Sequence, residues 1–93
     1  PVHETRQHLG SIRIHQNLSF SHNERTRLRR MIRQAKRHGW HLELIPDLGT
    51  AELTPDLQTH IYHTQVLIRD FMLPRGIPAK RIYLIATEEK QHS

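Results

Sequence analysis

The sequence predicts a small α/β domain, a two-layer βαβαβ sandwich with two helices on one face of a small mixed sheet. Two segments show the i, i+3, i+4 apolar spacing of amphipathic helices. Three short apolar runs of strand length alternate with them. The clearest junction lies in residues 67–86, where a helical pattern stops at Pro74, Gly76 and Pro78 and an apolar run begins. A helix delivered by such a turn onto a buried strand is typical of a βαβ crossover.

The length and composition restrict both the fold and the function. With 93 residues, the chain has room for one hydrophobic core. The formal net charge of +5 favours an acidic partner such as nucleic acid, anionic lipid or anionic wall polymer. Because cysteine is absent, the chain has neither a disulfide framework nor a thiolate metal site.

The ends of the chain bear on its location. No run approaches the ~18 apolar residues of a membrane span, and no signal-peptide pattern is present. Because the chain begins at Pro1 without a methionine, we expect a trimmed or mature form. The missing signal peptide therefore does not exclude export.

The first half of the chain contains a predicted strand and a predicted helix. Residues 1–10 are polar and aperiodic, and we expect an N-terminal arm or linker there. In residues 11–20, Ile12 and Ile14 alternate with polar residues, which predicts a strand with one buried face, interrupted near residues 16–17. Ser21 and Glu24 form a capping box, in which Ser21 accepts from the third helical amide and Glu24 reaches back to the cap amide.

The helix that follows has one apolar and one basic side, and it ends at His38-Gly39. Its apolar stripe consists of Leu28, Met31, Ile32 and Ala35. Seven of the thirteen residues from 25 to 37 are basic: Arg25, Arg27, Arg29, Arg30, Arg33, Lys36 and Arg37.

The second half repeats the order of strand and helix. Residues 40–45 alternate as a second strand, opened by Trp40 as a core anchor. Thr54-Pro55 predicts the start of a second helix, a cap residue followed by proline at the first helical position. Its inner face is expected to contain Leu57, Ile61, Thr64, Ile68, Phe71 and Met72. We expect a third strand at residues 81–86, a domain limit near residue 88 and a polar tail at residues 89–93.

Residues 67–82, LIRDFMLPRGIPAKRI, resemble the second half of an OmpA-like domain. In that family a helix ending in a Gly-Ile-Pro-type turn and an Arg-Ile pair leads into the last core strand. Residues 23–36 resemble the helix after the first strand, and residues 41–47 resemble the strand that ends in a Gly-His-Thr-Asp-type motif. The resemblance covers roughly residues 11–88 and implies an OmpA-like fold.

The resemblance also implies a peptidoglycan site. Family members hold the diaminopimelate group between an aspartate after the second strand and an arginine in the second helix, both through charge-assisted hydrogen bonds. Carried over position by position, the aspartate falls on Asp47. Counting back from Gly76, the arginine falls on Thr64, with His63 beside it. A neutral threonine cannot replace a bidentate guanidinium, and Arg69 lies about 140° further round the helix. The expected ligand site at Asp47, His63 and Thr64 is therefore degraded.

Similar degenerate domains occur in accessory lipoproteins of envelope machines, such as the CpaD-type component of Tad pili and lipoproteins of type IVB secretion systems. The resemblance therefore implies a non-catalytic structural subunit of a bacterial secretion system or pilus outer-membrane complex. Its partners would be other subunits of that complex. Its location would be the periplasm, associated with the outer membrane through an upstream lipid anchor that is not part of this chain. A genuine peptidoglycan anchor that uses Asp47 is the first alternative.

The second alternative is a small basic nucleic-acid-binding domain that uses the helix of residues 25–37. The candidate basic interaction face consists of Arg25, Arg29, Arg30, Arg33 and Arg37. Because no aromatic residues are interleaved with these arginines to stack bases, we favour a solvated face that docks on an acidic partner or wall polymer.

We expect no catalytic residue, cofactor or metal. The sequence has no Ser-centred elbow and no glycine-rich phosphate loop. His60 and His63 lie one helical turn apart near Asp56, but two histidines do not complete a tetrahedral site. Asp47 also suits a turn in Pro-Asp-Leu-Gly. The Thr64 hydroxyl is expected to bond a carbonyl one turn back in its helix.

Overall fold

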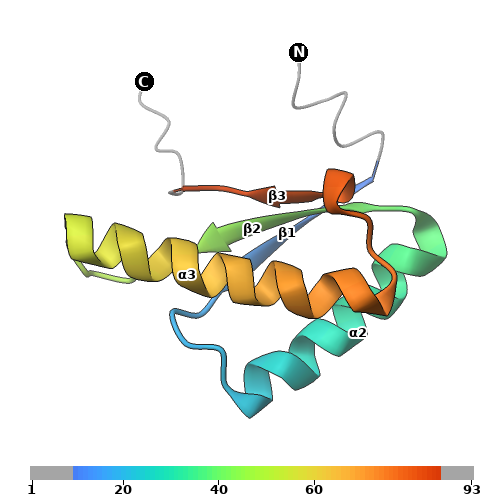
Figure 1. The fold of residues 1–93 in the computed structure, drawn as a ribbon, viewed down its shortest axis with the longest axis horizontal. Helices are drawn as coiled ribbons and strands as arrows, with labels where there is room; N and C mark the ends of the chain where they lie inside the picture. Colours follow the sequence, from blue (N-terminus) through green and yellow to red (C-terminus); the bar gives the residue numbers. More distant parts are fainter. Residues whose placement is uncertain (1–9, 87–93) are drawn as a thin grey trace.

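In the computed structural model, which describes residues 10–86, the chain forms three strands and two long helices (Figure 1). The elements, in chain order, are β1 (Ser11–Gln16), α2 (His22–His38), β2 (His41–Pro46), α3 (Pro55–Met72), the 3-10 turns η1 (Leu73–Arg75) and η2 (Ala79–Arg81), and β3 (Ile82–Leu84). The predicted α/β class and the β-α-β-α-β order are confirmed. The expected tail at residues 89–93, and the expected arm except for Gly10, lie outside the described residues.

The sheet has the strand order β1-β2-β3, and both of its pairings are parallel. Ile14 on β1 lies opposite Leu44 on β2, and Leu44 lies opposite Leu84 on β3. The described sheet is therefore wholly parallel, which corrects the mixed sheet of the prediction. The reason is that each connection carries a helix across the sheet and returns the chain in the same direction.

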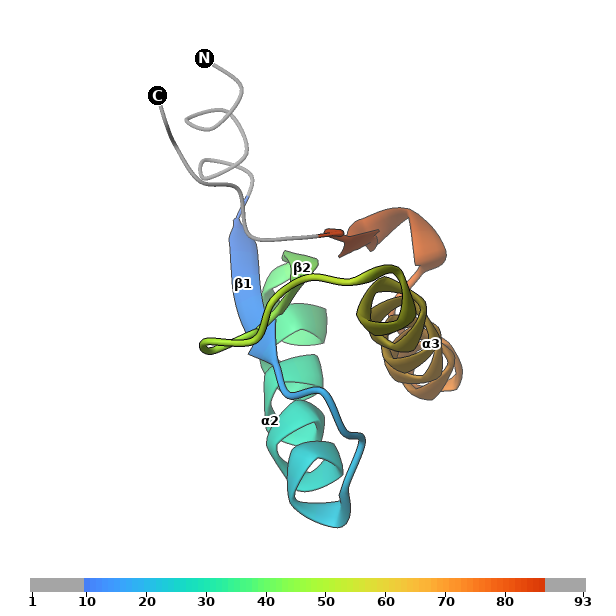
Figure 2. The ribbon, with the colours of Figure 1, turned by 90° about the vertical axis from the view of Figure 1, so that its left-hand side faces the viewer.

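Both helices pack on one face of the sheet (Figures 1 and 2). They share one core with the inward-facing strand residues. Its buried members are Ile14, Leu28, Ile32, Ala35, Leu42, Leu44, Ile68, Met72, Ile77 and Ile82. The predicted stripe of the first helix is part of this core, with Met31 half-buried beside it.

The helix termini use the local chemistry that the sequence indicates. The Ser21 hydroxyl accepts a hydrogen bond from the Glu24 amide at 3.3 Å, and the Thr54 hydroxyl accepts one from the Leu57 amide at 3.1 Å. Gly39, after α2, has a φ of 71°, and Gly76, after η1, has a φ of 104°. These left-handed conformations strain residues with a side chain, so glycine is the residue that ends each segment.

The third strand is shorter than residues 81–86. The turn η2 occupies Ala79–Arg81, so β3 contains only Ile82–Leu84. One further backbone bond follows, from the Ile85 amide to the Leu44 carbonyl at 3.0 Å. The apolar run thus predicts the position of the strand, whereas the preceding turn decides its length.

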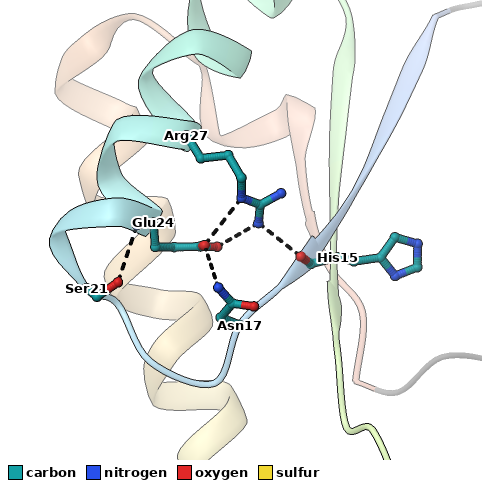
Figure 3. A network of polar contacts seen from close by, with 5 residues as sticks. All are labelled: His15, Asn17, Ser21, Glu24 and Arg27. Carbon is teal, nitrogen blue, oxygen red and sulfur yellow. Dashed lines mark hydrogen bonds and ion pairs between the residues drawn. The ribbon is translucent and has the colours of Figure 1, made fainter.

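A buried carboxylate fixes α2 against the end of β1 (Figure 3). Glu24 is only 2% exposed, and its carboxylate turns to Asn17 and Arg27 in place of the cap amide. The Asn17 amide donates to it at 3.0 Å, and the Arg27 guanidinium donates at 2.8 and 3.3 Å. Arg27 also donates to the backbone carbonyl of His15 at 3.0 Å. Side chains of the β1–α2 connection and the first turn of α2 are thereby joined in one network.

Replacing Glu24 by alanine should lower the free energy of unfolding by about 2 kcal/mol, because Arg27 and Asn17 would lose their acceptor. The loss should stay below that of a fully buried pair, since the Arg27 side chain is 35% exposed and can be rehydrated. Urea unfolding followed by circular dichroism measures it. Glu52→Ala, at an exposed position before α3, is the matched control. Equal losses in the two variants would contradict the role of the network.

Candidate functional site

The residues of the expected peptidoglycan site share no hydrogen bond or ion pair within residues 10–86. Asp47 follows β2 directly and is exposed, and its amide donates to the Gln16 carbonyl at 3.0 Å. His63 is exposed on α3. Within residues 10–86, no hydrogen bond or ion pair joins Asp47 to α3 or to any arginine.

Thr64 faces the interior and not a ligand. It is 3% exposed, and its hydroxyl donates to the His60 carbonyl at 3.0 Å. The predicted bond to a carbonyl one turn back is confirmed. Arg69, the nearest arginine along the helix, lies 4.0 Å from the carboxylate of Asp70. The resemblance implies an arginine at this position. The position instead holds a buried hydroxyl whose hydrogen bond is made within its own helix.

Gln65 has a structural role that the sequence did not indicate. It is 2% exposed, and its amide nitrogen donates to the Leu44 carbonyl at 3.2 Å and to the Ile85 carbonyl at 2.8 Å. These two bonds tie α3 to the ends of two neighbouring strands. The available signal was a glutamine between Ile61 and Ile68, on the inner face of a helix, where an apolar residue would be ordinary.

The basic residues of α2 point in three directions. Arg27 belongs to the buried network of Glu24. Arg25 and Arg29 lie beside aromatic rings, with the Arg25 guanidinium carbon 4.5 Å from the ring centre of Phe20. The Arg29 guanidinium carbon is 5.6 Å from the ring centre of Phe71. The remaining arginines of the predicted face are exposed on the side opposite the buried stripe: Arg30, Arg33 and Arg37.

Phe20 and Phe71 bring aromatic rings to the arginines, which the sequence did not indicate. Phe20 precedes α2 and Phe71 lies near the end of α3, yet their ring centres are 5.4 Å apart in an edge-to-face arrangement. A third arginine, Arg75 in η1, has its guanidinium carbon 3.7 Å from the ring centre of Phe71. Arg75 also donates to the Phe71 carbonyl at 2.8 Å. We call these five residues the arginine–phenylalanine cluster: Phe20, Arg25, Arg29, Phe71 and Arg75.

The sheet face away from the helices carries polar pairs. Arg13 on β1 donates to the carboxylate of Glu43 on β2 at 3.2 Å. The His41 ring nitrogen Nδ1 lies 3.0 Å from the Tyr83 hydroxyl, which links β2 to β3. Because Arg13 and Glu43 neutralise each other, this face is polar and carries little net charge from the pair.

The described residues show neither a cluster of possible metal ligands nor a membrane-spanning helix. Within residues 10–86, no three histidine, aspartate or glutamate side chains gather into a possible metal site. His60 and His63 are both exposed, and the His60 ring nitrogen Nε2 contacts the Leu18 carbonyl. In the same range, no helix combines the length and the hydropathy needed to cross a bilayer.

Comparisons with known proteins do not add a family. A scan against protein-family models, a search of curated proteins and a search of solved structures each found no match. The functional argument therefore depends on the geometry of this chain and on the resemblance of its residues 67–82.

Replacing Gln65 by leucine should cost about 1–2 kcal/mol of unfolding free energy, because the Ile85 carbonyl would lose its donor while the Leu44 carbonyl keeps the Ile85 amide. Gln58→Leu, at an exposed position of the same helix, should change it by less than about 0.5 kcal/mol. Thermal unfolding compares the two variants. Faster hydrogen exchange at the Ile85 amide should accompany only the first. An unchanged melting temperature for Gln65→Leu would contradict the bridging role.

Proposed function

We propose that this chain is a non-catalytic structural subunit of a bacterial cell-envelope assembly, a secretion system or a pilus outer-membrane complex. In this proposal the chain is an OmpA-like domain whose peptidoglycan site is degraded. It lies in the periplasm and reaches the outer membrane through a lipid anchor encoded upstream of Pro1. Its partners are other subunits of the same complex.

The observation that carries the proposal is the burial of Thr64. A peptidoglycan grip needs a guanidinium that forks onto the diaminopimelate carboxylate. Thr64 is neutral and points inward, and its hydroxyl is used by the His60 carbonyl. Asp47 remains exposed after β2, but a single carboxylate supplies only the half of the grip that pairs with the ammonium.

The helix end and the turn support the OmpA-like part of the proposal. The segment that carries the resemblance forms the end of α3, the left-handed Gly76 and the entry into β3. It follows a β-α-β unit in the order that the resemblance implies. With both helices on one face of the sheet, the exteriors of the helices are exposed and can contact other subunits.

Isothermal titration with a diaminopimelate-containing muropeptide tests the degraded site. The wild-type chain should give no saturable heat up to millimolar ligand, because the arginine half of the grip is missing. Asp47→Ala should behave in the same way, and Asp56→Ala, an exposed acid in the first turn of α3, is its matched control. Saturable binding that Asp47→Ala removes and Asp56→Ala retains would instead support the peptidoglycan anchor.

The coding sequence upstream of Pro1 provides an independent test of the location. It should encode a signal peptide followed by a lipobox cysteine, since an outer-membrane lipoprotein needs both. Fractionation of cells that carry the full-length protein should then recover it with the outer membrane. Recovery in the cytosolic fraction would contradict the envelope assignment and leave the domain architecture unaffected.

A further inference from the structure

The arginine–phenylalanine cluster gathers positive charge where α2 meets the end of α3. Its three arginines come from separate places in the chain, Arg25 and Arg29 from the first half of α2 and Arg75 from η1. All three are exposed, whereas Phe20 and Phe71 are half-buried. The cluster is therefore a surface feature that only the folded chain assembles.

The rings hold the guanidinium groups in place. Arg75 lies closest to its ring, at 3.7 Å from the Phe71 centre, and its bond to the Phe71 carbonyl fixes it further. Arg25 lies over Phe20, and Arg29 lies at a longer distance over Phe71. Stacking on an aromatic face uses the flat side of a guanidinium and leaves N–H groups at its edge for hydrogen bonds.

Within residues 10–86, no ion pair neutralises these three arginines. The ion pairs of that range engage Arg13, Arg27 and Arg69. Three like charges on one patch repel one another, and the stacking on the rings offsets part of this cost. An incoming anion would remove the repulsion and would meet donors that are already oriented.

We infer that the cluster is a docking site for an acidic segment of a partner polypeptide. The carboxylates of the segment accept forked hydrogen bonds from Arg25, Arg29 and Arg75. This inference rests on the proposed structural role and names the chemistry of the partner. The partner is a polypeptide and not a nucleic acid, because the two rings are half-buried and face guanidinium groups, which leaves little aromatic face on which bases could stack.

The outer face of α2 supplies an internal comparison. Arg30 and Arg33 are exposed on the same helix, on the side opposite its buried stripe. No ring contact of the described residues orients Arg30 or Arg33. Each carries the same single positive charge as an arginine of the cluster, but no described ring lies beside it.

The experiment measures the fluorescence anisotropy of a fluorescein-labelled polyglutamate peptide as protein is added. It compares the wild-type chain with two double variants, both of which keep the net charge of the protein. Arg29→Lys with Arg75→Lys replaces two guanidinium groups that lie over the Phe71 ring by point charges and should weaken binding about tenfold. Arg30→Lys with Arg33→Lys should change it less than about twofold. Equal effects of the two pairs, or no binding by the wild-type chain, would overturn the inference.

A second measurement depends on no variant and guards against a loss of folding. In the wild-type chain, the side-chain Nε–H resonances of Arg25, Arg29 and Arg75 should shift during titration with the glutamate peptide. Those of Arg30, Arg33 and Arg37 should shift less. The reverse pattern would overturn the inference.

A single-stranded DNA of equal charge is the competing probe. Tighter binding of this DNA than of the peptide, with a loss on changing Arg30 and Arg33, would overturn the inference in favour of nucleic acid. The muropeptide titration stays separate from these outcomes. Failure of the glutamate peptide to bind would contradict the docking site and leave the structural role standing. Muropeptide binding through Asp47 would contradict the structural role, and it is measured at a residue outside the cluster.

Discussion

The buried carboxylate of Glu24 is the constraint on which the arrangement of this domain depends. A carboxylate that is 2% exposed needs charged or polar partners, because leaving it unpaired away from water costs several kilocalories per mole. Arg27 and Asn17 supply them, and Arg27 adds a bond to the His15 carbonyl at the end of β1. Together with the burial of the apolar stripe of α2, these contacts fix the rotation of the helix about its own axis. Leu28, one turn further on, then faces the sheet as part of the core.

The rotation of α2 decides what each of its arginines can do. Arg27 is paired with Glu24, so its positive charge stabilises the fold and adds little to the surface charge of α2. Arg25 and Arg29 turn toward the end of α3, where Phe20 and Phe71 meet edge to face. Arg33 and its neighbours face solvent. The basic residues of α2 therefore form two different surfaces. On one, aromatic rings orient the guanidinium groups, and on the other the side chains are surrounded by solvent.

The polar side chains on the inner face of α3 form hydrogen bonds within the domain. Thr64 bonds its own helix, and Gln65 bonds carbonyls at the ends of β2 and β3. The neighbouring strand end exposes Asp47, which no described arginine joins. The part of α3 in which a peptidoglycan-binding arginine would be expected therefore holds residues that connect the helix to the sheet. This arrangement is consistent with a domain whose interactions lie on its outer surfaces.

The sequence by itself determined the features that neighbouring residues control. The caps at Ser21 and Thr54, the stop at Gly76, the order of strands and helices and the inward bond of Thr64 all depend on residues within about one helical turn. Only the tertiary structure decided the partners of Glu24, the bridge of Gln65 and the meeting of Phe20 with Phe71, because each joins segments distant in the chain or competes with a local alternative. The same distinction between local and long-range contacts applies to the candidate binding residues. The exposure of Asp47 follows from its turn, whereas the place of Arg75 beside α2 follows from packing that no local pattern encodes.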